Sequence, residues 1–169
     1  MTTFRHLFFV TAAALGLVTS ALAQSATVSG VDNVVDTSLP VEVTADELTV
    51  DQETGQAVFT GNVVAGQGEM RLSADEIKVE YETENGATTG EIERLLASGD
   101  VLLVNGPEAA EAREAIYSVG SGEVVMTGDV VLTQGNSALS GDKLIVDLST
   151  GKSRIVGRVR TILKAEGDQ

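Results

Sequence analysis

The chain has 169 residues, a formal net charge of −14 at pH 7 and 43% hydrophobic residues. It contains no Cys and only one His, which excludes a thiol nucleophile, a disulfide framework and a zinc site built on Cys and His. The excess of acidic residues also argues against nucleic acid as a partner, because such binding depends on Lys and Arg contacts to phosphates.

The first 23 residues predict a secretory signal peptide. Arg5 and His6 give it a positive start, residues 7–18 form a short apolar core, and an Ala-Leu-Ala cleavage site ends at Ala23. The apolar run is too short to span a membrane comfortably. Cleavage would remove the single His, which excludes a Ser-His-Asp triad, and would take the net charge to −15. We therefore expect an exported protein that is not an enzyme and holds no cofactor or metal.

Residues 24–39 are polar and end before Pro40, which predicts a flexible lead-in. The expected folded domain covers residues 40–164, and residues 165–169 form a C-terminal tail. Charge is uneven along the chain: residues 24–141 hold 21 acidic and four basic side chains, whereas residues 142–169 hold four acidic and six basic ones. This difference is either ordinary surface charge or a sign that the two ends meet different partners, or each other.

An internal repeat organises the expected domain. A short motif recurs at intervals of 29, 38 and 29 residues, with its copies anchored at Ala45, Ala74, Ala112 and Gly141. A Gly-x-Val motif follows in each copy, first as Phe-Thr-Gly-Asn-Val at 59–63. The longer interval contains an insert, at about 82–93, whose Asn85-Gly86 pair predicts a hairpin tip.

Each copy is rich in Val, Thr and Ile that alternate with polar residues, which predicts β-strands. The alternation slips by one residue at 45–47 and again at 74–77, and this predicts a corner where the strand bends around its core. Segment 107–116 is compatible with a helical turn, but its register in the repeat favours a strand. We therefore predict an all-β fold of four units, about 29 residues each, whose stacked faces form one apolar trough.

The repeated pattern resembles the OstA-like domain family of lipopolysaccharide-transport proteins. It reads Ala-Asp-x-(Leu/Ile)-x-Val, Thr-Gly, Phe-Thr-Gly-Asn-Val and Gln-Gly, and extends from about Pro40 to Lys164. Its most specific parts lie at 59–63, 99–101, 126–130 and 140–144. The resemblance implies an open, twisted β-jellyroll in the periplasm that carries lipopolysaccharide with the acyl chains inside the trough.

The resemblance also implies a bridge between two membranes. Jellyrolls of the family join head to tail through their terminal strands and connect an LptC-like inner-membrane protein with an LptD-like outer-membrane translocon. The expected oligomer edges are Val41, Val43, Ile162 and Leu163. The expected lipid-binding residues of the trough are Leu48, Val50, Phe59, Val63, Leu72, Ile77, Val79, Val101, Leu103, Met126, Val130, Leu132, Leu144, Val146, Ile155 and Val159. For any one of them, plain core packing is an equal alternative to lipid contact.

Several charged motifs have two interpretations each. The acidic pairs at 46–47 and 75–76 recur at the corner without an acid–base partner, which favours a solvated corner over a catalytic site. The loops 51–55 and 147–151 lack the full ligand pattern of a calcium loop, which favours ordinary turns. For the basic cluster, a solvated outer face is favoured over contact with lipid phosphates or a neighbouring protomer; it consists of Arg154, Arg158 and Arg160.

Two other classes of protein remain open at this point. One is a β-solenoid enzyme, such as a polysaccharide lyase or esterase, against which the missing His and the few aromatic residues argue. The other is a structural or adhesive β-repeat protein of the envelope that binds no lipid.

Overall fold

A computed structural model describes residues 25–29, 34–51 and 54–163. The expected signal peptide at 1–23 and the expected tail at 165–169 lie outside these ranges. The described residues form eleven strands and no helix, so the predicted all-β class is confirmed. This part of the chain accordingly offers no helix with the length and apolar character that a membrane span requires.

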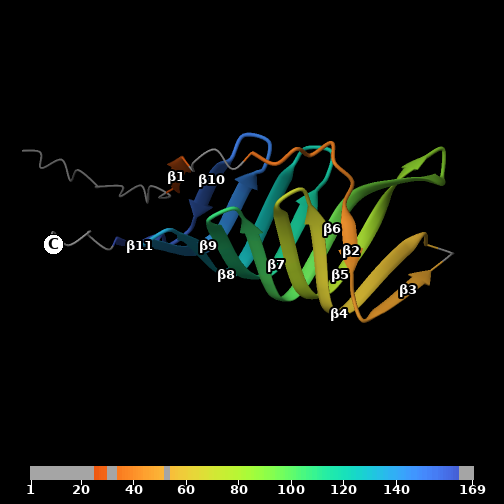
Figure 1. Ribbon diagram of the computed structural model, residues 1–169, viewed down its shortest axis with the longest axis horizontal. Coiled ribbons are helices and arrows are strands. Elements are labelled where there is room, and N and C mark those ends of the chain that lie inside the picture. Colours follow the sequence, from red (N-terminus) through yellow and green to blue (C-terminus); the bar gives the residue numbers. More distant parts are fainter. Residues whose placement is uncertain (1–24, 30–33, 52–53, 164–169) are drawn as a thin grey trace, which may run out of the picture.

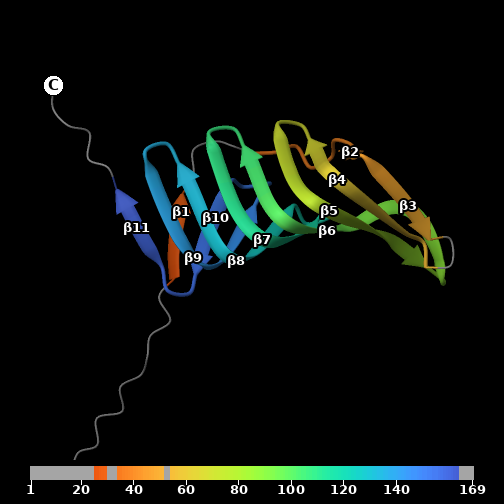
Figure 2. The same cartoon turned by 90° about the horizontal axis from the view of Figure 1, so that it is seen from below.

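The strands are short near both ends of the chain and 11 to 19 residues long in the middle. In chain order they are β1 (Ser25–Ser29), β2 (Glu42–Thr44), β3 (Glu47–Asp51), β4 (Gln56–Gln67), β5 (Met70–Glu84), β6 (Ala87–Asn105), β7 (Glu108–Ser118), β8 (Glu123–Gln134), β9 (Ser137–Asp147), β10 (Lys152–Val156) and β11 (Arg160–Leu163). They build a single antiparallel sheet, shown in Figures 1 and 2, in which each strand from β4 to β10 pairs with its neighbour along the chain.

Both ends of this sheet are split. β2 and β3 pair with different parts of β4, and β10 and β11 pair with different parts of β9. The split at 45–46 coincides with the predicted slip in the alternation. β1 pairs only with β10 among the described strands and covers its outer edge.

Two predictions about individual strands are confirmed. The Ala- and Glu-rich segment 107–116 forms most of β7 and not a helical turn. The insert at 82–93 extends the β5–β6 hairpin until Glu84 pairs with Ala87. Asn85 and Gly86 both have positive φ, 53° and 82°, as a tight hairpin turn of the Asn-Gly type requires.

The long strands bend at a corner marked by β-bulges. Between β4 and β5 the register shifts so that Gly61 and Asn62 together face the single residue Asp75. Gly61 has a φ of 77°, and a Cβ there would lie 2.6 Å from Oδ2 of Asp46, so only glycine fits. Positive-φ glycines also occupy the corner at Gly99, Gly128 and Gly157. The number of repeat units stays a prediction, but the predicted bend is present.

The bend divides each long strand into two halves and brings the halves face to face. β4 and β7 are not neighbours in the sheet, yet Tyr117 near the end of β7 donates a hydrogen bond to Gln67 at the end of β4. We call the β7–β8 and β9–β10 turns the first rim, and the β4–β5, β6–β7 and β8–β9 turns the second rim. The mouth is the line along which the two rims approach each other.

The segment expected to be a flexible lead-in differs from that expectation in its described part. Its first residues form β1, paired from Ser25 opposite Val156 to Ser29 opposite Lys152. Further along, Val35 is 5% exposed and its N–H donates to the carbonyl of Leu148 at 2.8 Å. A polar sequence does not prevent such pairing, because the edge of β10 offers backbone groups to any extended chain.

Candidate functional site

One continuous apolar core fills the space between the two halves of the sheet. Strand alternation produces it, because every second side chain of β4 to β10 points inward on both sides of the corner. Twelve of the expected trough residues lie in it with no more than 7% exposure: Val63, Leu72, Ile77, Val79, Val101, Leu103, Met126, Val130, Leu132, Leu144, Val146 and Ile155. Phe59 and Val159 are partly buried and pack against it.

The two remaining trough residues lie outside this covered core. Leu48 and Val50 on β3 are 51% and 58% exposed. They pair with Phe59 and Ala57 on the neighbouring strand β4, so they lie on the same inner face of the sheet. Among the described residues no opposing strand covers them, since β3 lies at an end of the sheet and pairs with β4 alone. The apolar face therefore has a covered part and an uncovered part, and their role in lipid binding stays a prediction.

Sequence patterns did not identify several residues of the core. Tyr117 and Leu148 are both fully buried. Leu148 lies in the segment 147–151, whose sequence predicts a turn, and alternation gives no information there. Tyr117 continues the alternation of β7, but its Ala- and Glu-rich neighbours give only a weak apolar pattern. Other fully buried apolar residues outside the predicted set are Ala65, Met70, Leu95 and Val124.

A polar contact joins the two rims at the mouth. The Gln67 side chain is 1% exposed, and its amide nitrogen donates to the carbonyls of Thr37 at 3.0 Å and Leu39 at 2.7 Å. Its amide oxygen accepts the hydroxyl proton of Tyr117. Burial raises the pKa of Tyr117 to about 12, so the phenol stays a neutral donor. In the sequence, Gln67 belongs to the Gln-Gly that closes the repeated pattern, and nothing there marks it as buried.

A second polar pair lies on the second rim, the one that also carries Gln67. Gln134 donates to the half-buried carboxylate of Glu108, which borders a small cavity of about 10 Å³ between the two halves. Burial raises the pKa of Glu108, and the hydrogen bond from Gln134 works in the opposite direction. A space of this size holds about one water molecule and is far too small for an acyl chain. The interior is thus tightly packed at this point.

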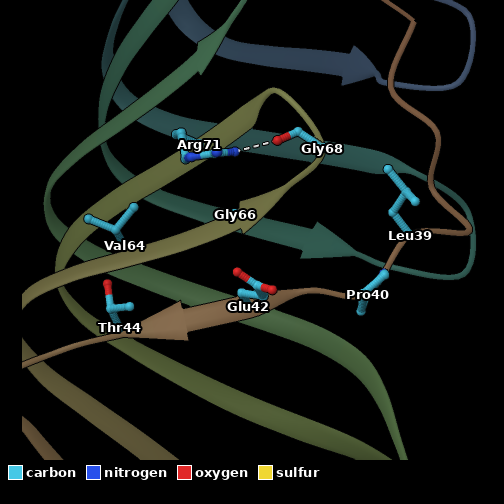
Figure 3. A pocket seen from close by; sticks show the side chains of 8 residues that line it. All are labelled: Leu39, Pro40, Glu42, Thr44, Val64, Gly66, Gly68 and Arg71. Carbon is cyan, nitrogen blue, oxygen red and sulfur yellow. Dashed lines mark hydrogen bonds between the residues drawn. The ribbon is translucent and has the colours of Figure 1, made fainter.

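Figure 3 shows a hollow on the outer face of β2, β4 and β5. Gly66 lines it, and a Cβ added there would lie 3.2 Å from Nη1 of Arg71. Arg71 lines it, and its guanidinium donates to the carbonyls of Gly68 at 2.6 Å and Met70 at 2.7 Å. Glu42 and Thr44 complete a mixed polar lining. This outer hollow is a poorer match for an aliphatic ligand than the inner face.

The charged motifs lie where their simpler interpretations predicted. Asp147 accepts hydrogen bonds from the N–H groups of Ser149 at 3.0 Å and Thr150 at 3.1 Å, which is turn chemistry. The Ser149 hydroxyl also donates to Asp147, at 2.6 Å. Together these hydrogen bonds lower the pKa of Asp147, and the bond from the Ser149 hydroxyl contributes most. At the corner, Asp46 accepts a bond from Asn62 on the exposed surface. The basic cluster is also exposed, at Arg154, Arg158 and Arg160.

The expected oligomer edges lie at opposite ends of the sheet. Val43 lies within β2 and Val41 immediately precedes it, and both pack partly against the core. Ile162 on β11 is exposed, and β11 ends at Leu163. In the described structure β2 pairs only with β4, and β11 pairs only with β9. Each strand therefore has one side available for backbone pairing.

Comparison with known proteins gives two matches. A family model described as LptA/(LptD N-terminal domain) LPS transport protein matches residues 42–152. A solved structure of similar fold is LptH of Pseudomonas aeruginosa, described as the LptA homologous periplasmic component of the conserved lipopolysaccharide transport device. The two structures agree with a TM-score of 0.66 and 20% sequence identity, over 77% of this chain and 99% of that chain. No curated protein matches the sequence.

Proposed function

The chain belongs to the LptA/(LptD N-terminal domain) family of lipopolysaccharide-transport proteins, and we propose that it is a periplasmic carrier that holds lipid A acyl chains between the two halves of its sheet. Family membership confirms the resemblance that the repeat indicated. This is a family of transport proteins, which agrees with the expectation that the chain is not an enzyme. The likeness to the periplasmic LptH supports the proposed location.

The continuity of the apolar inner face carries this proposal. The buried aliphatic side chains run without interruption from β4 to β10, and Leu48 and Val50 continue the same face on β3. Each CH₂ group removed from water contributes about 0.8 kcal/mol, so an aliphatic path favours acyl chains along its whole length. Because the contacts are nondirectional, no single position has to hold the lipid tightly.

The charge distribution supports contact through acyl chains rather than head groups. The whole chain carries a net charge of −14, and lipopolysaccharide head groups carry phosphates. The basic residues Arg154 and Arg158 lie on the outer surface, where Arg158 is already paired with Asp142 at 3.1 Å. A carrier of this kind leaves the head groups in water, where repulsion is screened.

We also propose that the split ends of the sheet join other jellyrolls. β2 and β3 at one end and β11 at the other present strand edges and exposed apolar residues, such as Leu48 and Ile162. Strand addition across such edges would align the inner faces of successive proteins. On this proposal, the partners are further copies of the chain, an LptC-like inner-membrane protein and an LptD-like translocon.

One observation favours a second candidate, an envelope β-repeat protein that binds no lipid. The core residues between the rims have lost nearly all their exposure, and the cavity beside Glu108 has only about 10 Å³. A core packed in this way needs no ligand to be stable. The two candidates differ in whether the halves of the sheet separate.

Photo-crosslinking at neighbouring positions of β4 distinguishes the two candidates. Phe59 points inward and Val58 points to the opposite face, and both are only partly buried. With a photoreactive phenylalanine analogue at Phe59, we expect covalent adducts with lipopolysaccharide in cells. The same analogue at Val58 serves as the control and is expected to give few. Absence of adducts at Phe59, or equal adducts at both positions, would contradict lipid binding on the inner face.

A further inference from the structure

Residues 34–40, which we call the strap, run along the mouth of the interior before the chain enters β2. In Figure 1 this segment is drawn in orange and follows the upper edge of the sheet from the side of β10 to β2. The strap is not part of the sheet. It has local structure of its own, since Leu39 donates its N–H to the carbonyl of Asp36 at 3.2 Å and Ser38 donates to the Asp36 carboxylate.

The strap contacts both rims. On the first rim, the Val35 N–H is bonded to Leu148, and a Cβ added at Gly122 would lie 3.0 Å from the Thr37 methyl group. On the second rim, Gln67 donates to two strap carbonyls, and Gly68 lies against Leu39. The strap therefore bridges the two halves of the sheet at the place where they must separate to admit a ligand.

Val35 inserts its side chain into the core itself. It is 5% exposed and belongs to the same buried cluster as the inner face, whereas the adjacent Val34 is 60% exposed. A buried valine at the mouth takes part of the apolar area that an acyl chain would use. The valine side chain and an acyl chain cannot occupy the same position in the packed core.

We infer that the strap is an intramolecular gate that competes with the acyl chains of lipopolysaccharide and leaves the mouth when the lipid binds. This inference rests on the proposed function. The closed form binds no lipid, so the apparent affinity equals the affinity of the open form multiplied by the fraction of molecules with the strap released. Gating of this kind would keep the apolar interior out of water between cargo molecules.

Neighbouring valines of the strap provide a matched pair of variants. Val35→Asp places a charge at a buried position and should release the strap, while Val34→Asp adds the same charge at an exposed one. Neither residue belongs to the sheet. We expect Val35→Asp to bind lipopolysaccharide about 10-fold more tightly than Val34→Asp, because the competing closed state is lost. Equal affinities of the two variants would overturn the gate.

Hydrogen exchange on the unmodified chain tests the gate without any substitution. The Val35 amide is bonded to Leu148 and should exchange slowly in the free protein. Saturation with lipopolysaccharide should accelerate its exchange about 10-fold or more. Unchanged or slower exchange in a chain that binds lipopolysaccharide would overturn the gate alone, with slower exchange indicating a strap that stays over the lipid. A chain that binds no lipopolysaccharide at all would overturn the gate and the proposed function together.

Discussion

The inner face of the sheet continues from β3 to β10, but its two parts have different surroundings. Between the rims, residues such as Ile77 and Leu144 are fully buried by the opposite half of the sheet. On β3, Leu48 and Val50 belong to the same face and remain more than half exposed. The alternation of residues decides which face is apolar, whereas the bend and the strap decide how much of that face water reaches. The two parts should therefore respond differently to the same kind of substitution.

Truncation of a leucine or isoleucine should give the largest contrast between the two parts. Ile77→Ala removes buried methyl groups from the covered part and should lower the free energy of unfolding by about 2–5 kcal/mol. Leu48→Ala in the uncovered part should lower it by less than about 0.5 kcal/mol, as is usual for exposed positions. Urea unfolding of both variants measures this difference. Similar losses would show that β3 is covered in solution.

The bend itself should be sensitive to a single methyl group. Gly61→Ala would combine a φ of 77° with a Cβ placed 2.6 Å from Asp46, at an expected cost of about 2–3 kcal/mol. Gly86 at the hairpin tip is the control, because its φ is 82° but no atom lies within 4 Å of the added Cβ. Gly86→Ala should lower the free energy of unfolding by only about 1 kcal/mol, because the added methyl group strains the backbone but contacts no other atom. If urea unfolding gave the same loss of stability for Gly61→Ala and Gly86→Ala, the corner at Gly61 would not be crowded.

The contact between the rims should produce a specific dependence on pH. The pKa of Tyr117 is about 12 in the folded chain and 10.0 without burial, so the neutral phenol is favoured by folding. Its contribution is fully present below pH 10 and is lost as pH rises toward 12. Tyr117→Phe should cost about 1 kcal/mol at neutral pH and abolish this part of the alkaline loss. The measurement is the free energy of unfolding of the unmodified chain and of Tyr117→Phe between pH 9 and about 12. The same pH dependence in both chains would contradict the buried contact.

The smallest effect is expected at the exposed corner. Asn62 pairs with Asp46, Arg113 with Asp129 and Arg158 with Asp142, whereas the corresponding positions at the β5–β6 register shift are held by two carboxylates, Asp75 and Asp100. Replacing one carboxylate by an amide recreates the first of these pairs. Asp100→Asn should therefore raise the free energy of unfolding by about 0.2–0.5 kcal/mol, and more at low salt. A loss of stability would show that the two carboxylates do not face each other.

Much of the covered part was predictable from sequence, because strand alternation is a local signal. The repeat correctly indicated the all-β class, the bend and the strand at 107–116. It also indicated the burial of residues such as Leu72 and Val130.

The closure of the mouth was not predictable in the same way. Val35, Gln67, Tyr117 and Leu148 meet there although they come from distant parts of the chain. The polar composition of residues 24–39 favoured a flexible segment, and nothing local marks Val35 as buried. Contacts between segments 30 or 50 residues apart leave no periodic pattern in the sequence. For the same reason, sequence alone did not separate Leu48 and Val50 from the covered residues.

Methyl NMR with lipopolysaccharide that carries a spin label on an acyl chain tests the central claim most directly. Leu144 and Ile145 are adjacent in β9, with Leu144 fully buried on the inner face and Ile145 on the opposite face. If the acyl chains lie between the halves of the sheet, the methyl signals of Leu144 will broaden strongly and those of Ile145 much less. Equal broadening, or broadening of Ile145 alone, would place the lipid on the outer surface and contradict the account.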